Sequence, residues 1–171
     1  PEAEGVSSEG LITFLDSAAV SPHEFHSIMV VRHGKVIAEG WWDPYGPDLR
    51  HTLYSTSKSF TSTAVGFAVT EELLGVDDRV ISFFPDQLPD SVSPFLAEMT
   101  VKDLLTMSAG QSPDPTRTIA SSNSSDWVAS FLALPVPDEP GSEFLYNSMA
   151  TFMLSAIVQK VTGEKVIDYL Q

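Results

Sequence analysis

The sequence predicts an α+β fold in which an antiparallel hairpin near the N-terminus is followed by a long helical region. Residues 26–42, HSIMVVRHGKVIAEGWW, are two runs rich in Val and Ile around His33-Gly34, which is the composition and turn chemistry of a β-hairpin. From Leu53 onward the apolar residues recur at helical spacing, and no second strand-rich segment follows. Because a lone hairpin is marginally stable in water, we expect this one to need further strands or a covering helix.

Capping residues and breakers predict the remaining elements. A short helix is expected over Gly10 to Ala19, with Ser7 or Ser8 as its N-cap, and a long helix within Leu53 to Gly75, with Gly75 as the left-handed residue after its end. Further helices are predicted at Thr100–Met107 and Asp126–Leu134, each capped by its first residue, and at Met149–Val161 and Glu164–Leu170. Surface loops are predicted at Asp43–His51, Ile81–Pro94, Gln111–Ser125 and Pro135–Gly141.

Composition excludes several classes of function. Nine Lys and Arg residues against 23 Asp and Glu give a formal charge of -14 without basic clusters, which argues against nucleic acid or an anionic membrane as partner. The absence of cysteine excludes disulfides, thiolate zinc sites and cysteine nucleophiles. No apolar run approaches the roughly 18 residues of a transmembrane segment, and no basic-then-apolar leader is present. The chain starts at Pro1 without a methionine, so the sequence leaves cytoplasmic, periplasmic and secreted locations open.

Metal and cofactor sites are not predicted. The four histidines, His23, His26, His33 and His51, lack the i, i+4 spacing of a helical zinc pair. Glycine-rich patterns that bind phosphates are also absent. We therefore predict neither a cofactor nor a metal ion.

Ser55 and Lys58 are the first candidates for catalysis. Helical spacing of three places both side chains on one face, so the ammonium group lies within reach of the hydroxyl. Serine is a weak nucleophile until a neighbouring group accepts its proton, and Ser-Lys is a recurring arrangement. The structural alternative is an N-cap serine beside a surface lysine. The first turn of a helix disfavours a cation by about a few tenths of a kcal/mol, which favours the catalytic interpretation.

Three segments in order, YSTSKSFTSTAVGFAVTEELLGVDD, MTVKDLLTMSAG and EFLYNSMATFMLSAIVQKVTG, resemble the penicillin-recognising serine hydrolases. The similarity is greatest to the branch of class C β-lactamases, D-alanyl-D-alanine carboxypeptidases and related esterases, and it covers Ser27 to Leu170. The resemblance implies a β-lactamase/transpeptidase-like fold, with the antiparallel sheet packed against the helical region and the site between them. It also implies an acyl-enzyme in which Ser55 attacks an amide, ester or lactam carbonyl of a small-molecule or peptide-like substrate. Lys58 as a neutral amine or Tyr146 as a phenolate would take the proton, and the sequence does not choose between them.

The chain departs from the family pattern at its second motif. The usual Tyr-x-Asn reads Tyr146-Asn147-Ser148 here, so a hydroxyl takes the place of the amide and Asn147 is displaced by one residue. Ser148 and Asn147 are the candidate substrate-binding residues. A serine is shorter and offers one proton, which leaves ester or amide hydrolysis more open than β-lactam hydrolysis.

The third family motif, Lys-Thr-Gly or His-x-Gly on a strand, is absent from these residues. We therefore expect residues 1–171 to be the N-terminal part of one catalytic domain, with the helix and hairpin in 1–52 and the helical motif region in 53–171. Missing C-terminal strands would be its partners, and the chain alone would be inactive, since losing one oxyanion donor costs about 100 to 1000-fold in rate. The alternatives are a carboxylesterase or amidase without β-lactam activity, a non-catalytic acylatable sensor, and an inactive structural fragment.

Overall fold

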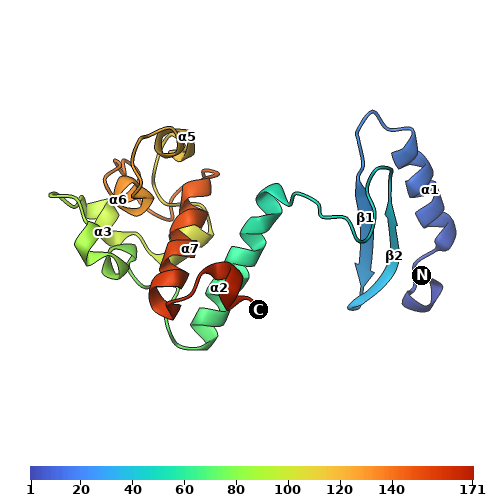
Figure 1. Ribbon diagram of the computed structural model, residues 1–171, viewed down its shortest axis with the longest axis horizontal. Coiled ribbons are helices and arrows are strands. Elements are labelled where there is room, and N and C mark those ends of the chain that lie inside the picture. The colour runs from blue at the N-terminus through green and yellow to red at the C-terminus, as the bar shows by residue number, and fades with distance from the viewer. The chain divides into compact units, whose positions relative to one another are not determined.

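The computed structural model describes residues 1–171, which form two compact units, Pro1–Leu53 and Tyr54–Gln171 (Figure 1). The first unit contains a helix and a two-stranded antiparallel sheet, and the second contains helices only.

In the first unit, helix α1 (Ser8–Ala19) lies beside a hairpin formed by β1 (Ser27–Arg32) and β2 (Lys35–Trp41), after a short 3-10 turn, η1 (Glu2–Glu4) (Figure 1). The Oγ of Ser7 accepts a hydrogen bond from the Gly10 amide at 3.2 Å, so of the two predicted N-caps Ser7 is the one used. The strands pair from Ser27 with Trp41 to Arg32 with Lys35, with an irregularity between Val30 and Val31. The predicted helix and hairpin are therefore confirmed, the helix starting two residues early.

The turn of the hairpin depends on backbone conformation. His33 and Gly34 both have positive φ, 50° and 75°, as a type I′ turn requires of its two central residues. This turn matches the right-handed twist of the strands, which explains why two residues suffice to join them.

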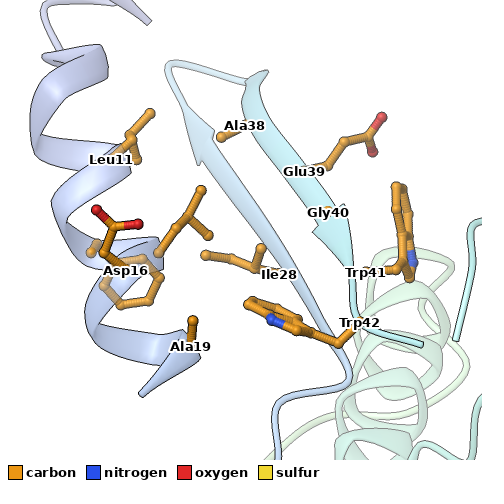
Figure 2. A pocket seen from close by; sticks show the side chains of 11 residues that line it. Leu11, Asp16, Ala19, Ile28, Ala38, Glu39, Gly40, Trp41 and Trp42 are labelled. Atoms are coloured by element: carbon orange, nitrogen blue, oxygen red, sulfur yellow. The ribbon is translucent and has the colours of Figure 1, made fainter. Parts of the chain in front are cut away.

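Apolar side chains from helix and hairpin line a cavity of about 360 Å³ inside the first unit. Figure 2 shows Ile28 and Trp42 of the hairpin region pointing toward α1, where Leu11 and Ala19 face them. Glu39 and Trp41 lie on the other side of the strand. The helix thus provides the cover that the isolated hairpin needs on one of its faces.

The second unit is built on two long helices, α2 (Ser57–Thr70) and α7 (Ser148–Thr162), which pack against each other (Figure 1). Helix α2 contributes buried Ala64, Val65 and Ala68, and the small alanines let the two backbones approach closely. The remaining elements of this unit are short: η2 (Tyr54–Thr56), η3 (Val80–Phe83), η4 (Pro85–Gln87), α3 (Pro94–Glu98), α4 (Val101–Leu105), α5 (Thr116–Ala120), α6 (Trp127–Leu132) and α8 (Val166–Tyr169). All of them except η2 and η4 contribute residues to the core or pack against it.

The N-caps predicted for two helices of this unit are confirmed. Thr100 and Asp103 form a reciprocal capping box at the start of α4, and Asp126 accepts from the Ala129 amide at the start of α6. Helix α7 ends at Gly163, which has a left-handed φ of 78°.

The prediction that Gly75 follows the end of the long helix is wrong. Helix α2 ends at Thr70, and Glu72 takes the left-handed conformation with a φ of 60°. This early turn brings Leu74 into the core at 6% exposure. Burying a leucine gains about 1.5–3 kcal/mol, which outweighs the cost of about 1–2 kcal/mol for a left-handed residue other than glycine.

Two predicted loops contain short helices. The segment Ile81–Pro94 includes the turn η4, and Gln111–Ser125 includes α5; in addition α3 was not predicted. Each of these elements is only three to five residues long and lies among Ser, Thr and Pro, so no periodicity is visible. Leu96 and Ile119 hold α3 and α5 in the core, each 2% exposed.

Residues 107–111 lie along residues 138–145, joined by backbone hydrogen bonds. The amides of Asp138, Gly141 and Leu145 donate to the carbonyls of Gly110, Ser108 and Met107 at 3.1, 2.8 and 2.9 Å. Gly110 has a φ of 72°, and a Cβ atom there would collide with the carbonyl oxygen of Asp138. The close approach of the two segments therefore requires glycine.

We expect Gly110→Ala to lower the free energy of unfolding by about 2–5 kcal/mol, because it adds a left-handed alanine and an overpacked contact. Gly66 in the exposed face of α2 is the matched control, since nothing lies within 4 Å of a Cβ added there. Gly66→Ala should raise stability by about 0.5–1 kcal/mol. Urea unfolding followed by circular dichroism measures both, and equal effects would contradict this account.

Candidate active site

Ser55 and Lys58 meet at the start of α2. Ser55 lies in the 3-10 turn that leads into the helix, and Lys58 is the second helical residue. The Lys58 Nζ donates a hydrogen bond to the Ser55 Oγ at 3.2 Å. The predicted contact between the two side chains is present, so a charged donor faces the hydroxyl.

Tyr146 reaches the same hydroxyl from a distant part of the sequence. Its Oη lies 2.7 Å from the Ser55 Oγ, although the two residues are 91 positions apart. The Lys58 Nζ lies 5.2 Å from the centre of the Tyr146 ring. Tyr146 lies two positions before Ser148, the first residue of α7, so the packing of α2 on α7 brings the three side chains together.

The surroundings of Tyr146 favour its ionised form. Hydrogen bonding to Ser55 lowers the pKa of the Tyr146 phenol below its ordinary value, and the hydrogen bond and positive charge of Lys58 act in the same direction. Ser148 contributes a smaller lowering, while desolvation opposes it. A phenolate at this point can accept the proton of the Ser55 hydroxyl.

The backbone around Ser55 is held in an unusual conformation. Tyr54 has a left-handed φ of 46°, rare for a residue other than glycine, and its carbonyl accepts a hydrogen bond from the Ser57 Oγ at 2.7 Å. Thr56 caps α2 without a side-chain hydrogen bond. The positive end of the helix dipole therefore lies beside Ser55 and favours negative charge there.

Asn147 and Ser148, the candidate substrate-binding residues, have different surroundings. Asn147 is 2% exposed, and its Oδ1 accepts from the amides of Met149 and Ala150 at 3.0 and 3.1 Å. Its Nδ2 donates to the Oε1 of Gln111 at 2.9 Å. Both ends of the Asn147 amide are thus bonded within the protein, whereas Ser148 is half-buried and lies near the Tyr146 phenol.

Sequence reasoning missed two residues that shape this region, Tyr54 and Gln111. The left-handed backbone of Tyr54 follows from the chain path, and no residue type signals it. Gln111 lies in a segment that its composition predicted to be a surface loop, yet it is 4% exposed. Only its contact with Asn147 indicates a role.

Residues 26–171 match the protein family described as Beta-lactamase. The chain belongs to this family. The predicted resemblance and the α+β, β-lactamase-like fold class are confirmed.

Curated relatives and solved structures are longer than this chain. The sequence is 27% identical over 156 residues to Protein flp of Staphylococcus aureus strain MW2, covering 84% of this chain and 31% of that protein. It is 28% identical over 157 residues to 6-aminohexanoate-dimer hydrolase of Paenarthrobacter ureafaciens, covering 84% and 40%. The structure is similar to the β-lactamase/D-alanine carboxypeptidase of Pseudomonas syringae, with a TM-score of 0.73, 21% identity and coverage of 95% and 47%. The β-lactamase-family chain thus spans less than half the length of these proteins. None of its helices is long and apolar enough to cross a bilayer.

We expect Lys58→Met to raise the pKa of Tyr146 toward that of ordinary tyrosine, because it removes a hydrogen bond and a positive charge from the phenol. NMR of protein labelled with ¹³C in the tyrosine rings measures this pKa, and Tyr146→Phe assigns the signal among the four tyrosines. Ser148→Ala should produce a smaller rise. An unchanged pKa in the Lys58 variant would show that the two side chains do not interact.

Proposed function

We propose that the protein is a serine hydrolase that cleaves an amide, lactam or ester bond through an acyl-enzyme on Ser55. The observation that carries this proposal is the pair of contacts on one hydroxyl, with the Lys58 Nζ at 3.2 Å and the Tyr146 Oη at 2.7 Å. A nucleophile within hydrogen-bond reach of a base, with a third group that orients the base, is the general arrangement of nucleophilic catalysis.

In the proposed reaction, the Tyr146 phenolate takes the proton of Ser55 while the Ser55 Oγ forms a bond to the substrate carbonyl carbon. The carbonyl electron pair moves to its oxygen, then returns and expels the leaving group, which takes the proton from Tyr146. Water next attacks the carbonyl carbon of the acyl-serine while Tyr146 accepts a proton from the water. The bond between that carbon and the Ser55 Oγ then breaks, the acid is released, and Tyr146 returns the proton to the Ser55 Oγ. Lys58 remains an ammonium ion throughout and stabilises the phenolate. The 2.7 Å contact between the Tyr146 Oη and the Ser55 Oγ and the lowered pKa of the phenol support this assignment, and neutral Lys58 as the base is the alternative.

The developing negative charge on the carbonyl oxygen needs hydrogen-bond donors. The backbone amide of Ser55, beside the positive end of α2, is suited to supply one of them. We propose that residues 1–171 are the N-terminal part of one catalytic domain and that a further strand supplies the second donor. The exposed apolar side chains of the hairpin, Met29, Val31 and Val36 at 59%, 56% and 51% exposure, support pairing or packing with additional strands.

The substrate proposed is a small-molecule or peptide-like ester or linear amide. In the Tyr-x-Asn pattern a free side-chain amide lies beside the tyrosine. Here the hydroxyl of Ser148 lies near Tyr146 instead, and the amide of Asn147 is hydrogen-bonded within the protein. The names of two similar proteins, 6-aminohexanoate-dimer hydrolase and the hydrolase EstCE1 with acyltransferase activity, are consistent with this class. β-Lactam hydrolysis is the alternative.

Covalent labelling tests the proposal. A fluorophosphonate should modify Ser55, as located by mass spectrometry, and Ser55→Ala should abolish the label. Tyr146→Phe should slow labelling by about 100 to 10,000-fold, the contribution of a positioned base. Ser59→Ala, a serine one turn further along α2, is the matched control and should label normally.

The same experiment separates the candidate activities. Labelling by a tagged penicillin as well would favour a β-lactam substrate, and phosphonate labelling alone would favour an esterase or amidase. Single acylation without release of product would identify an acylatable sensor. Failure of both reagents to label Ser55 in residues 1–171 alone would support the incomplete catalytic domain. Failure of both reagents in a chain that also carries the further strand would contradict the assignment of the nucleophile.

A further inference from the structure

We propose that Gln111 is a positioning residue for Tyr146 and acts on it through Asn147. The inference rests on the proposed function, since it concerns how the base of that reaction is held. It adds a buried residue outside the three family motifs to the machinery of the site.

The Tyr146 side chain has little packing to hold it in place. It is 45% exposed and is not among the residues that pack against the core of the second unit. Its hydroxyl contacts Ser55, and the neighbouring charged group is Lys58 of α2; Ser148 of α7 is the remaining polar neighbour. The position of the ring must therefore be set by the backbone on either side of it.

Both flanking residues are attached to residues 107–111. On one side, the Leu145 amide donates to the Met107 carbonyl at 2.9 Å. On the other side, the Asn147 Nδ2 donates to the Gln111 Oε1 at 2.9 Å. Tyr146 thus lies between two attachments to a single segment.

The amide of Asn147 links this attachment to helix α7. Its Oδ1 accepts from two backbone amides in the first turn of the helix, and the Gln111 contact holds the other end of the same planar group. Because both ends of a rigid group are fixed, the peptide that joins Tyr146 to Asn147 cannot rotate freely. The Gln111 contact therefore fixes Tyr146 relative to the start of α7.

Gln111 is a buried polar residue that uses one end of its amide. It is 4% exposed, and its Nε2 is buried without a hydrogen-bond partner. Its Oε1 is the acceptor of the buried Asn147 Nδ2, which an apolar side chain of similar shape would leave unsatisfied. What Gln111 provides is an acceptor oxygen at a defined point.

The segment that carries Gln111 is itself fixed in register. Gly110 lies so close to Asp138 that no other side chain fits, and the Asp138 amide donates to the Gly110 carbonyl. The Gln111 Oε1 is therefore presented to Asn147 from a rigid support.

Gln111→Met tests the proposal, because methionine has a similar shape but no acceptor oxygen, whereas Gln111→Glu keeps an oxygen at that point. In the methionine variant we expect the pKa of Tyr146, followed by ¹³C NMR, to rise toward that of ordinary tyrosine. The pH midpoint of fluorophosphonate labelling at Ser55 should rise by the same amount. At a pH below the midpoint, each unit by which the pKa of Tyr146 rises should make labelling about tenfold slower than in the wild type, because the phenolate fraction falls about tenfold. Gln111→Glu should restore both values at least in part.

A stability control separates positioning from general damage. Leu132→Ala removes a side chain of α6 that is 1% exposed and should destabilise the protein without moving either midpoint. Unchanged pKa and labelling midpoints in Gln111→Met, with wild-type protein labelled at Ser55, would overturn the inference. If wild-type protein that includes the further strand is not labelled, the proposed function fails, and the NMR measurement on residues 1–171 still decides whether Gln111 positions Tyr146.

Discussion

The packing of α2 against α7 is the contact on which the rest of the site depends. Ala64 and Ala68 of α2 and Ala150 of α7 are fully buried, so the two helices approach closely. Ser55 and Lys58 belong to the start of one helix and Tyr146 to the approach to the other. A shift between the helices would separate the Tyr146 phenol from the Ser55 hydroxyl, which lie 2.7 Å apart. The Tyr146 ring does not pack against the hydrophobic core, so core packing would not keep the two groups together.

The groups that Lys58 contacts explain why a cation is found in the first turn of α2. The helix dipole disfavours a cation in the first turn of a helix. Because the chain has a net charge of -14, the electrostatic energy of a lysine would be more favourable at many other surface positions. Its contacts with the Ser55 hydroxyl and the Tyr146 ring compensate for that position. The hydrogen bond between Tyr146 and Ser55 lowers the pKa of the Tyr146 phenol, and the charge of Lys58 lowers it further. A residue that is locally unfavourable thus lowers the pKa of the phenol beside the Ser55 hydroxyl.

The order Tyr-Asn-Ser has a structural explanation at the start of α7. Ser148 is the first helical residue of α7, whereas Asn147 before it is the N-cap and has an extended backbone, so an amide moved back by one position takes the capping position. Asn147 turns inward, caps the helix and binds Gln111. Ser148 takes the position nearer the phenol. The Tyr-Asn-Ser order therefore replaces a free amide beside the tyrosine by a buried amide that caps α7 and binds Gln111.

The sequence by itself determined the elements whose signals are local. These are the hairpin around His33-Gly34, the caps Thr100 and Asp126, and the Ser55 to Lys58 contact, which follow from turn chemistry, side-chain caps and helical spacing. The end of α2 and the short helices in predicted loops were decided by burial of Leu74, Leu96 and Ile119, and no local pattern reports that burial. No local pattern predicts that Tyr146 meets Ser55 across 91 residues, which the sequence implied only through its resemblance to a family. The tertiary structure alone decided that Gln111 binds Asn147. Such contacts depend on which helix faces pack together, a property of the whole unit.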